Sequence, residues 1–217
     1  MILQAIQISN KFYLNNFFKI FNTCALSVIT ISALSIYTNS ANTNSLIVVT
    51  IMSTLLQIHL TGMLMLVTAD IINNSQQSTI NYYIKSLFYI ISLGVVGLIV
   101  GIVLILGFVA FIIPGIFLLG KLIFAQYFLI LKGKGIVESL ELSWKTESNI
   151  AWNLGLTIFI IVLIWGLFIG LISSLFLNDQ GALEPFFIFL TSISSFVVLN
   201  IYLNIFLIHL FIIEGSQ

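Results

Sequence analysis

The chain carries little charge and no arginine. Of its 217 residues only 6% are charged, and the seven basic residues are all lysines. A soluble domain carries roughly a quarter charged residues, because its surface must stay hydrated. This composition therefore excludes an ordinary soluble domain. The formal net charge of zero also argues against a broad basic surface, so we expect no nucleic-acid partner.

Cysteine and catalytic motifs are also scarce. The single cysteine, Cys24, excludes an intramolecular disulfide and a cysteine-based metal cluster. The sequence contains no HExxH, no GxSxG and no P-loop. We therefore expect a protein that is not an enzyme and that has no metal site and no cofactor.

What the chain has in abundance is long apolar runs. Hydrophobic residues make up 60% of it, and the mean hydropathy is +1.19. A membrane helix needs about 20 mostly apolar residues. Six runs fit, at residues 18–37, 46–72, 87–113, 116–131, 150–177 and 186–213. The sequence thus predicts an all-α, polytopic membrane bundle that forms a single domain over residues 1–217, with short interfacial amphipathic helices.

The boundary between the third and fourth runs is marked by Pro114 and Gly115. Proline lacks a backbone donor and glycine permits a tight reversal, so the pair predicts a sharp hairpin turn or a kink. The fourth run is short for a full crossing. A re-entrant or strongly tilted element is the alternative there.

The lysines predict the orientation. If the N-terminus is cytoplasmic, the inner segments hold Lys11, Lys19, Lys85, Lys132, Lys134 and Lys145. The outer segments, 38–45, the Pro-Gly turn and 178–185, then hold no lysine. Cytoplasmic loops carry the lysine excess in membrane proteins. We therefore expect both termini in the cytoplasm.

Three polar-to-amphipathic stretches, 4–16, 79–86 and 136–149, precede the three pairs of runs. In the third stretch Val137, Leu140 and Trp144 recur at helical spacing and share a face. Glu141 and Lys145 form a favourable i,i+4 pair. This pattern predicts a helix along the cytoplasmic membrane surface, and three related units of interfacial helix plus hairpin.

The segment 113–152, IPGIFLLGKLIFAQYFLILKGKGIVESLELSWKTESNIAW, is the most distinctive part of the chain. It resembles the YciC-like family of bacterial inner-membrane proteins, and more broadly the membrane domains of some glycerophosphodiester phosphodiesterases. The matching positions are Pro114, Gly115, Lys121, Gly135, Ser139, Ser143, Trp144 and Lys145. Relatives tend to carry arginines in the amphipathic helix, where this chain has Glu138, Glu141 and Glu147. The resemblance implies a multi-pass protein of the bacterial inner membrane with a largely undefined activity.

Three ionisable side chains within the runs are candidate functional residues. Lys121 lies inside an apolar segment, where a charge is unfavourable unless it snorkels or finds a partner. It is expected either to reach the outer headgroups or to serve as a binding or coupling charge, with Gln126 as a candidate partner. His59 and His209, both in Ile-His-Leu contexts, could bond between helices, handle protons or solute, or bind a metal.

Glycine spacing predicts close helix packing. Gly94, Gly97 and Gly101 share one face of the third run, and Gly166 and Gly170 form a GxxxG pair in the fifth. Glycines let helix backbones approach closely. The contact could lie within the chain, or it could be a seam to a second copy or to another membrane protein.

Three functions remain open from the sequence. The leading hypothesis is a non-enzymatic protein that supports envelope integrity or membrane-protein assembly. The alternative is a small transporter or channel with a polar path through Lys121, His59 and His209. A third is the binding of membrane lipid, with an anionic headgroup near Lys132 and Lys134.

Overall fold

A computed structural model describes residues 2–40, 43–75, 77–176 and 185–214, and within these ranges the chain is helical and has no strand. The helical elements are α1 (Ile2–Ser40), α2 (Thr43–Ile72), α3 (Thr79–Ala110), α4 (Ile112–Leu122), α5 (Ala125–Leu131), α6 (Ile136–Trp144), α7 (Ser148–Ser173), η1 (Ser174–Phe176), α8 (Pro185–Ser195), η2 (Phe196–Tyr202) and α9 (Leu203–Glu214). The predicted all-α class is confirmed.

Among the described residues, six helical stretches are long and apolar enough to cross a membrane. They are Ile2–Ile36, Ser45–Ile72, Thr79–Ala110, Ile112–Leu131, Ser148–Phe176 and Pro185–Ile213. Six apolar stretches of this length make the chain a multi-pass membrane protein. The first and third begin well before the predicted starts at 18 and 87. The predicted outer loop at 178–184 lies outside the described residues.

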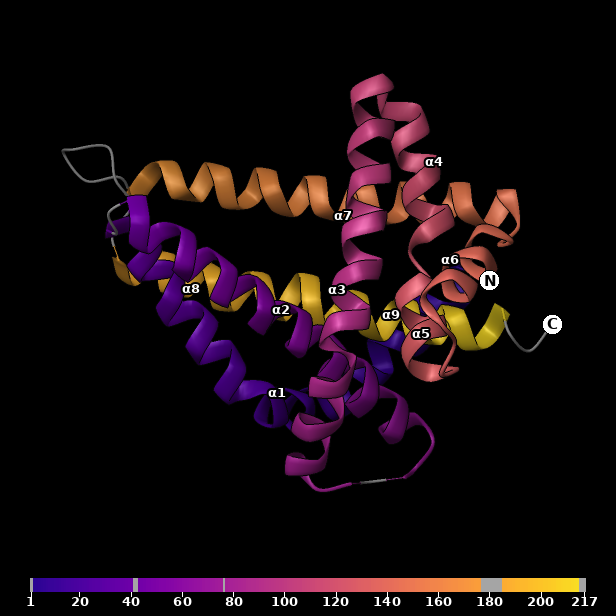
Figure 1. Ribbon diagram of the computed structural model, residues 1–217, viewed down its shortest axis with the longest axis horizontal. Coiled ribbons are helices and arrows are strands. Elements are labelled where there is room, and N and C mark those ends of the chain that lie inside the picture. Colours follow the sequence, from indigo (N-terminus) through magenta and orange to yellow (C-terminus); the bar gives the residue numbers. More distant parts are fainter. Residues whose placement is uncertain (1, 41–42, 76, 177–184, 215–217) are drawn as a thin grey trace.

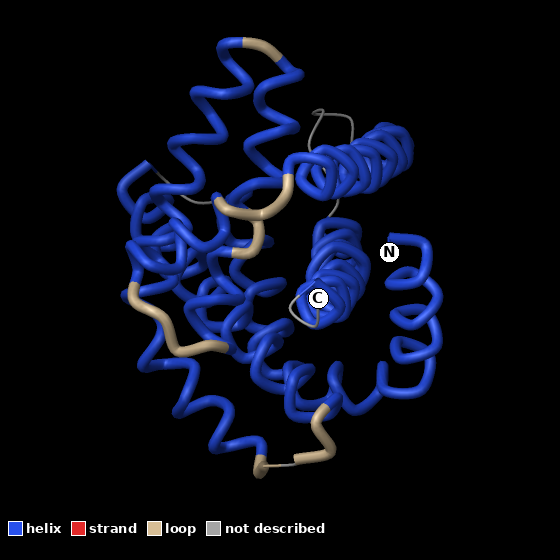
Figure 2. Tube along the Cα trace, turned by 90° about the vertical axis from the view of Figure 1, so that its right-hand side faces the viewer, coloured by secondary structure: helices blue, strands red, loops and turns tan. Residues whose placement is uncertain are grey.

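The long helices do not all share one direction (Figure 1). Helices α1, α2, α7 and the last span, α8 to α9, run across the view, whereas the α3–α4 hairpin stands steeply across them. Figure 2 gives the same arrangement from the side, with α7 and the last span seen end-on and the hairpin projecting beyond them. Both chain termini lie at the same end of the molecule, near α5 and α6 (Figure 1).

The reversal between α3 and α4 is centred on Phe111, not on Pro114 and Gly115. Phe111 is extended, with φ −166° and ψ 153°, and its amide donates to the Gly107 carbonyl over 3.0 Å. Pro114 lies in the first turn of α4, where the missing backbone donor would have no intrahelical acceptor anyway. Gly115 sits at the hairpin contact, because a side chain there would run into the Phe108 ring.

Two of the spans are not continuous α-helices. The fourth is interrupted between Leu122 and Ala125, and α5 completes it. The last contains η2, a π-helical segment over Phe196–Tyr202. Wider helical turns of this kind are rare and often occur near functional sites.

Of the three predicted amphipathic stretches, only the third forms a helix of its own, α6. The first is continuous with α1 and the second opens α3. The expected three related units, each with a separate interfacial helix, are therefore not present in the described chain. The first two stretches continue directly into their runs, whereas a turn at residues 145–147, with Glu147 at φ −54° and ψ 140°, separates α6 from α7.

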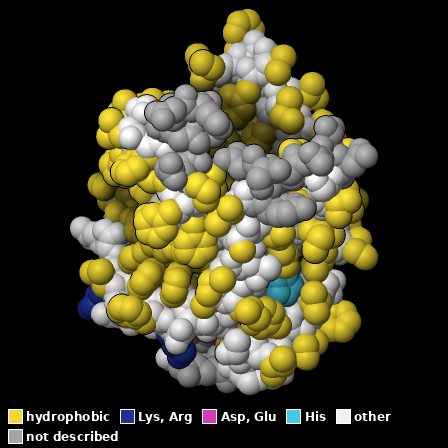
Figure 3. Space-filling model, turned by 90° about the vertical axis from the view of Figure 1, so that its left-hand side faces the viewer, with side chains coloured by type: hydrophobic (Ala, Val, Ile, Leu, Met, Phe, Trp, Pro, Cys, Tyr) yellow, Lys and Arg dark blue, Asp and Glu magenta, His cyan; other side chains and the backbone are white. Residues whose placement is uncertain are grey.

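Buried apolar side chains form two clusters. One includes Tyr127, Leu154 and Phe206, and the other includes Cys24 and Met63. Outside these clusters the surface is largely apolar, as Figure 3 shows for one face, where the visible lysines lie near the lower edge. Lipid tails suit such a surface better than water does.

Candidate functional site

Lys121 is buried, with 9% of the residue exposed, and it points at the end of helix α6. Its ammonium donates to the Trp144 carbonyl over 3.2 Å and also to the Thr146 carbonyl. The carbonyls at a helix C-terminus lack intrahelical donors and carry partial negative charge. Lys121 therefore caps α6, with the Phe117 ring 5.7 Å from its nitrogen. The structure places it neither toward outer headgroups nor against Gln126.

Helix α6 rests on the rest of the protein through its serines. Ser139 and Ser143 are fully buried, and the Ser143 hydroxyl donates to the Lys121 carbonyl over 2.7 Å. Val137 and Trp144, on another side of the helix, are 77% and 50% exposed. Because these two side chains point away from the protein, they are placed to contact a membrane surface.

The charges of α6 form two exposed pairs. Lys134 lies 2.6 Å from Glu138, and Lys145 lies 2.8 Å from Glu141, as the sequence pattern predicts for the second pair. The hydrogen bond from Lys145 and its positive charge lower the pKa of Glu141 below the ordinary value. Since Lys134 is paired with a carboxylate, it offers less charge to an anionic headgroup than its sequence position implies.

His59 joins α2 to α3. Its Nε2 atom lies 2.8 Å from the Ser86 hydroxyl and 3.2 Å from the Tyr83 carbonyl. Because Ser86 donates its own proton to the same carbonyl over 2.9 Å, Nε2 acts as the donor to Ser86. The ring is thereby fixed between two helices, as the interhelical-bond hypothesis expects.

His209 of α9 contacts α1. Its Nδ1 donates to the Ile205 carbonyl over 2.8 Å and lies 3.3 Å from the Ser9 hydroxyl. The Phe12 ring packs edge-on against the imidazole, with 5.0 Å between centroids. His209 thus ties the last helix to α1.

The three ionisable candidates do not form one path. Within the described chain, no hydrogen bond or ring contact joins any two of Lys121, His59 and His209, and each has its own partners. A polar path through them stays a prediction without a contact to support it.

Among the described residues, none of the predicted glycine positions lies in a tight contact between helix backbones. An added Cβ at Gly94 would be 3.6 Å from Ile58, and at Gly97 3.9 Å from Gln126. At Gly101, Gly166 and Gly170 it would meet nothing within 4 Å among the described residues. These glycines remain available for a seam to another molecule, and that reading stays a prediction.

The close helix contact lies instead between α4 and α7. A side chain at Gly120 would overlap the Ala151 carbonyl, and one at Gly155 would overlap the Ile116 carbonyl. Ala151 and Gly155 are spaced by four in the sequence, as in the small-residue motif of membrane helices. This spacing was a usable signal, and the sequence reasoning missed it.

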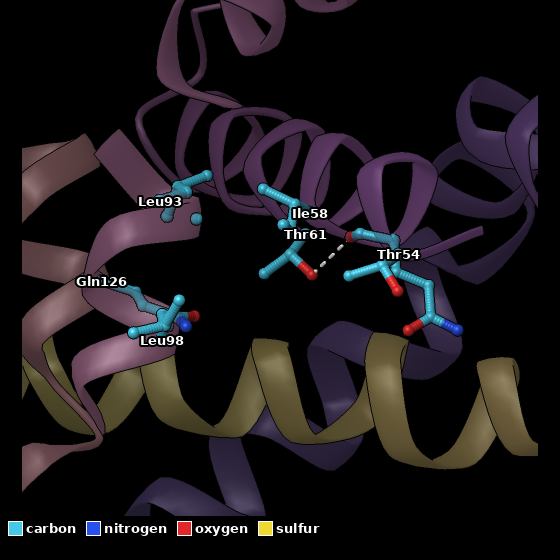
Figure 4. Close-up of a pocket in the computed structure, with 9 residues that line it drawn as sticks. Thr54, Ile58, Thr61, Leu93, Leu98 and Gln126 are labelled. Atoms are coloured by element: carbon cyan, nitrogen blue, oxygen red, sulfur yellow. Dashed lines mark hydrogen bonds between the residues drawn. The ribbon is translucent and has the colours of Figure 1, made fainter. Parts of the chain in front are cut away.

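A polar cleft opens where α2 and α3 diverge. It has a volume of about 480 Å³, and it is lined by Thr54, Gln57, Ile58, Thr61, Leu93, Gly94, Gly97, Leu98 and Gln126. In Figure 4, Thr54 and Thr61 of α2 and Gln126 of α5 border the same space. The absence of side chains at Gly94 and Gly97 leaves the α3 wall flat and makes room for the cleft.

The sequence carries a signal for this cleft. Thr54, Gln57 and Thr61 are spaced by three and four residues, so they line one face of α2. Of the polar residues that line the cleft, only Gln126 was singled out from the sequence, as a possible partner for Lys121. The stripe of Thr54, Gln57 and Thr61 does not by itself predict a cleft, because uncharged polar residues are also common where helices pack together.

A second hollow of about 330 Å³ lies on the other side of Gln57, between α1, α2, α7 and the last span. Several of its polar groups are engaged within the protein. Ser35 and Ser192 hydroxyls are 2.9 Å apart, and the Trp165 indole donates to Ser195 over 3.2 Å. This hollow therefore serves mainly to join helices.

In comparisons with known proteins, no protein-family model, no curated protein and no solved structure matches the chain. The resemblance to the YciC-like family stays a prediction from the segment 113–152.

Proposed function

We propose that the chain is a non-enzymatic, multi-pass protein of a bacterial inner membrane that acts by binding another membrane protein or a second copy of itself. In this role it would support membrane-protein assembly or envelope integrity. The resemblance of segment 113–152 to the YciC-like family agrees with this function.

The observation that carries the proposal is the outer half of α7. Leu163, Leu167 and Leu171 are exposed there, and Gly166 and Gly170 have no described neighbour within 4 Å. Two glycines one turn apart form a shallow groove into which another helix can pack, because backbone contact is a source of attraction between membrane helices. Within the chain, the other side of this half is tied to the last span by Trp165.

The chemistry of the titratable side chains supports a binding role over catalysis or transport. Lys121 and His209 each donate to a backbone carbonyl, and His59 donates to the Ser86 hydroxyl. A group whose proton is held in a hydrogen bond between helices or segments is engaged in structure and is poorly placed to relay protons or to act as an acid or base.

The lysine distribution supports an orientation with both termini in the cytoplasm. The termini lie at the same end of the molecule, with α5 and α6 (Figure 1). Lys132 and Lys134 follow α5, so this end holds basic residues, as the positive-inside rule expects for the cytoplasmic side.

Native mass spectrometry of the full chain, extracted directly into lipid nanodiscs, tests the proposal. We expect a dimer or a retained membrane-protein partner, which Gly166→Leu removes by filling the groove. Leu87→Phe adds similar bulk at an exposed position of α3, outside the proposed surface, and serves as the control, with the complex preserved. A wild-type chain that is monomeric and free of partners would contradict the proposed function.

A further inference from the structure

The cleft between α2, α3 and α5 contains polar groups that the protein does not satisfy. The Gln57 and Gln126 amides have no hydrogen-bond partner within the described chain. An unpartnered polar group within an apolar span is unfavourable by roughly several kcal/mol in hydrocarbon. Gln126 is half-buried and Gln57 is exposed at the mouth of the cleft, so a ligand or water in the cleft can supply the missing bonds.

The threonines define what else the ligand can bind. The Thr54 hydroxyl donates to the Thr50 carbonyl over 2.8 Å, and the Thr61 hydroxyl donates to the Gln57 carbonyl over 2.9 Å. Each hydroxyl has used its one proton and keeps free lone pairs. The threonines can therefore accept bonds from a ligand, while the two amides can both donate and accept.

No charged side chain lines the cleft. A phosphate or an ammonium would enter without a counterion, at a high desolvation cost. The polar part of the ligand is therefore uncharged, with a hydroxyl group that donates to a threonine and carbonyl oxygens that accept from the amides.

The surroundings determine the rest of the ligand. Ile58 and Leu93 form the apolar wall, and Leu98 at the rim is 62% exposed. The exposed surfaces of α2 and α3 beyond the rim are apolar as well, with Leu55 and Ile102 facing outward. Since the cleft opens onto a surface that contacts lipid tails, its ligand enters sideways from the bilayer and carries an apolar body.

We propose that this cleft binds a neutral lipid with free hydroxyl and ester groups, of the diacylglycerol class. The single free hydroxyl would donate to Thr61, an ester carbonyl would accept from Gln126, and the acyl chains would lie along α2 and α3. The volume of about 480 Å³ lies within the range of small-ligand sites and accommodates the glycerol part with the first segments of the chains.

The test uses the full chain in phosphatidylcholine nanodiscs that contain dioleoylglycerol, with retained lipid measured by native mass spectrometry. We expect one dioleoylglycerol to be retained per chain. Dioleoylphosphatidylglycerol, which has the same chains and an anionic headgroup, is expected to be retained at least ten-fold less. Glycerol alone is expected not to bind, which separates a membrane lipid from a water-soluble source of the same groups.

Two variants locate the site. Gln126→Leu removes one amide and should lower dioleoylglycerol occupancy about five- to ten-fold, as expected for one lost hydrogen bond. Gly97→Phe fills the cleft and should abolish retention. Gln7→Leu makes the first change on an exposed part of α1, away from the cleft, and should leave retention unchanged.

Unchanged retention in both cleft variants would overturn the proposal, as would equal retention of the two dioleoyl lipids. A diacylglycerol with a photoreactive acyl chain adds a readout that does not depend on variants, and it should label peptides from α2 and α3. Gly166→Leu should leave lipid retention intact, so the failure of this inference is distinguishable from the failure of the proposed function.

Discussion

The ammonium of Lys121 caps the C-terminus of helix α6 through the carbonyl of Trp144, 3.2 Å away. The two residues belong to different elements, and the Ser143 hydroxyl adds a return bond to the Lys121 carbonyl. The lysine in the apolar segment thus holds a short surface helix, α6, against the rest of the protein. Its partners are backbone groups, which any residue type at position 144 would supply.

Replacing Lys121 by methionine should loosen α6. Methionine keeps the apolar stem but leaves the Trp144 and Thr146 carbonyls without their donor, at about 1–3 kcal/mol of unfolding free energy. Hydrogen exchange over residues 136–147 should rise several-fold, and the thermal midpoint should fall. Lys11→Met, which removes an exposed charge on α1, is the control and should leave both nearly unchanged. A Lys121→Met chain with wild-type exchange in α6 would show that the cap has no mechanical role.

Alanine at Gly120 or Gly155 should destabilise the protein, because the new methyl group overlaps a backbone carbonyl of the facing helix. Separating α4 from α7 to make room should cost about 1–3 kcal/mol. Gly166→Ala is the matched control, since nothing lies within 4 Å of that position. It should be neutral, or stabilising by up to about 1 kcal/mol through helix propensity. Thermal unfolding of the three variants in nanodiscs measures the contrast, and equal midpoints would contradict the packing geometry.

The same comparison shows how far the sequence predicts the fold. The spans are predictable because length and apolarity are local properties of each run. Which glycines touch a neighbour is not, because Gly166 and Gly120 look alike until the direction of each helix is known. The GxxxG spacing places two glycines on one face, and only tertiary contacts decide whether that face meets Ala151 or open space.

The candidate site was less predictable for a similar reason. Lys121 and its acceptor Trp144 are separated by a helix break, a glycine-containing turn and α6, so no short-range pattern links them. The turn itself depends on Gly133, whose φ of +61° suits glycine. The cleft around Gln126 arises from the divergence of α2 and α3, which no sequence period encodes.

The local stability of α6 should depend on pH, partly through the carboxylate of Glu141. Lys145 lowers the pKa of Glu141 in the folded protein below its value in the unfolded chain. The pair therefore contributes stability above the unfolded pKa and loses it as the pH falls through the folded pKa. Both side chains are exposed, so the effect should be small. Wild type and Glu141→Gln are compared at the same pH across a series. Their hydrogen exchange in α6 should differ at neutral pH and become equal in acid. A difference that persists at low pH would exclude this carboxylate as the source.

The tip of the α3–α4 hairpin should lie in the membrane and not at its outer surface. From Leu93 to Gly120 the chain has no polar side chain, and Phe111 at the turn is 75% exposed. Exposure of such a turn to water is unfavourable by roughly 25 cal/mol for each Å² of apolar surface. The hairpin also stands steeply across the other spans (Figure 1), whereas membrane helices tilt on average by about 20°. Both ends of the hairpin would remain on the lysine-bearing side, so the charge distribution is the same whether or not the tip crosses.

Cysteine labelling in cells decides between these two placements. In a Cys24→Ser chain, Ile112→Cys should react with a membrane-impermeant maleimide only after denaturation, because the reaction needs a thiolate and thus water. Lys132→Cys, at the opposite end of the hairpin, is the control and should react once the cytoplasmic side is made accessible. Rapid labelling of Ile112→Cys in intact cells would place the tip at the outer surface and make α3 and α4 two full crossings. Protection of that position would give a bundle with four crossings and one hairpin held within the bilayer, beside the cleft that α3 helps to form.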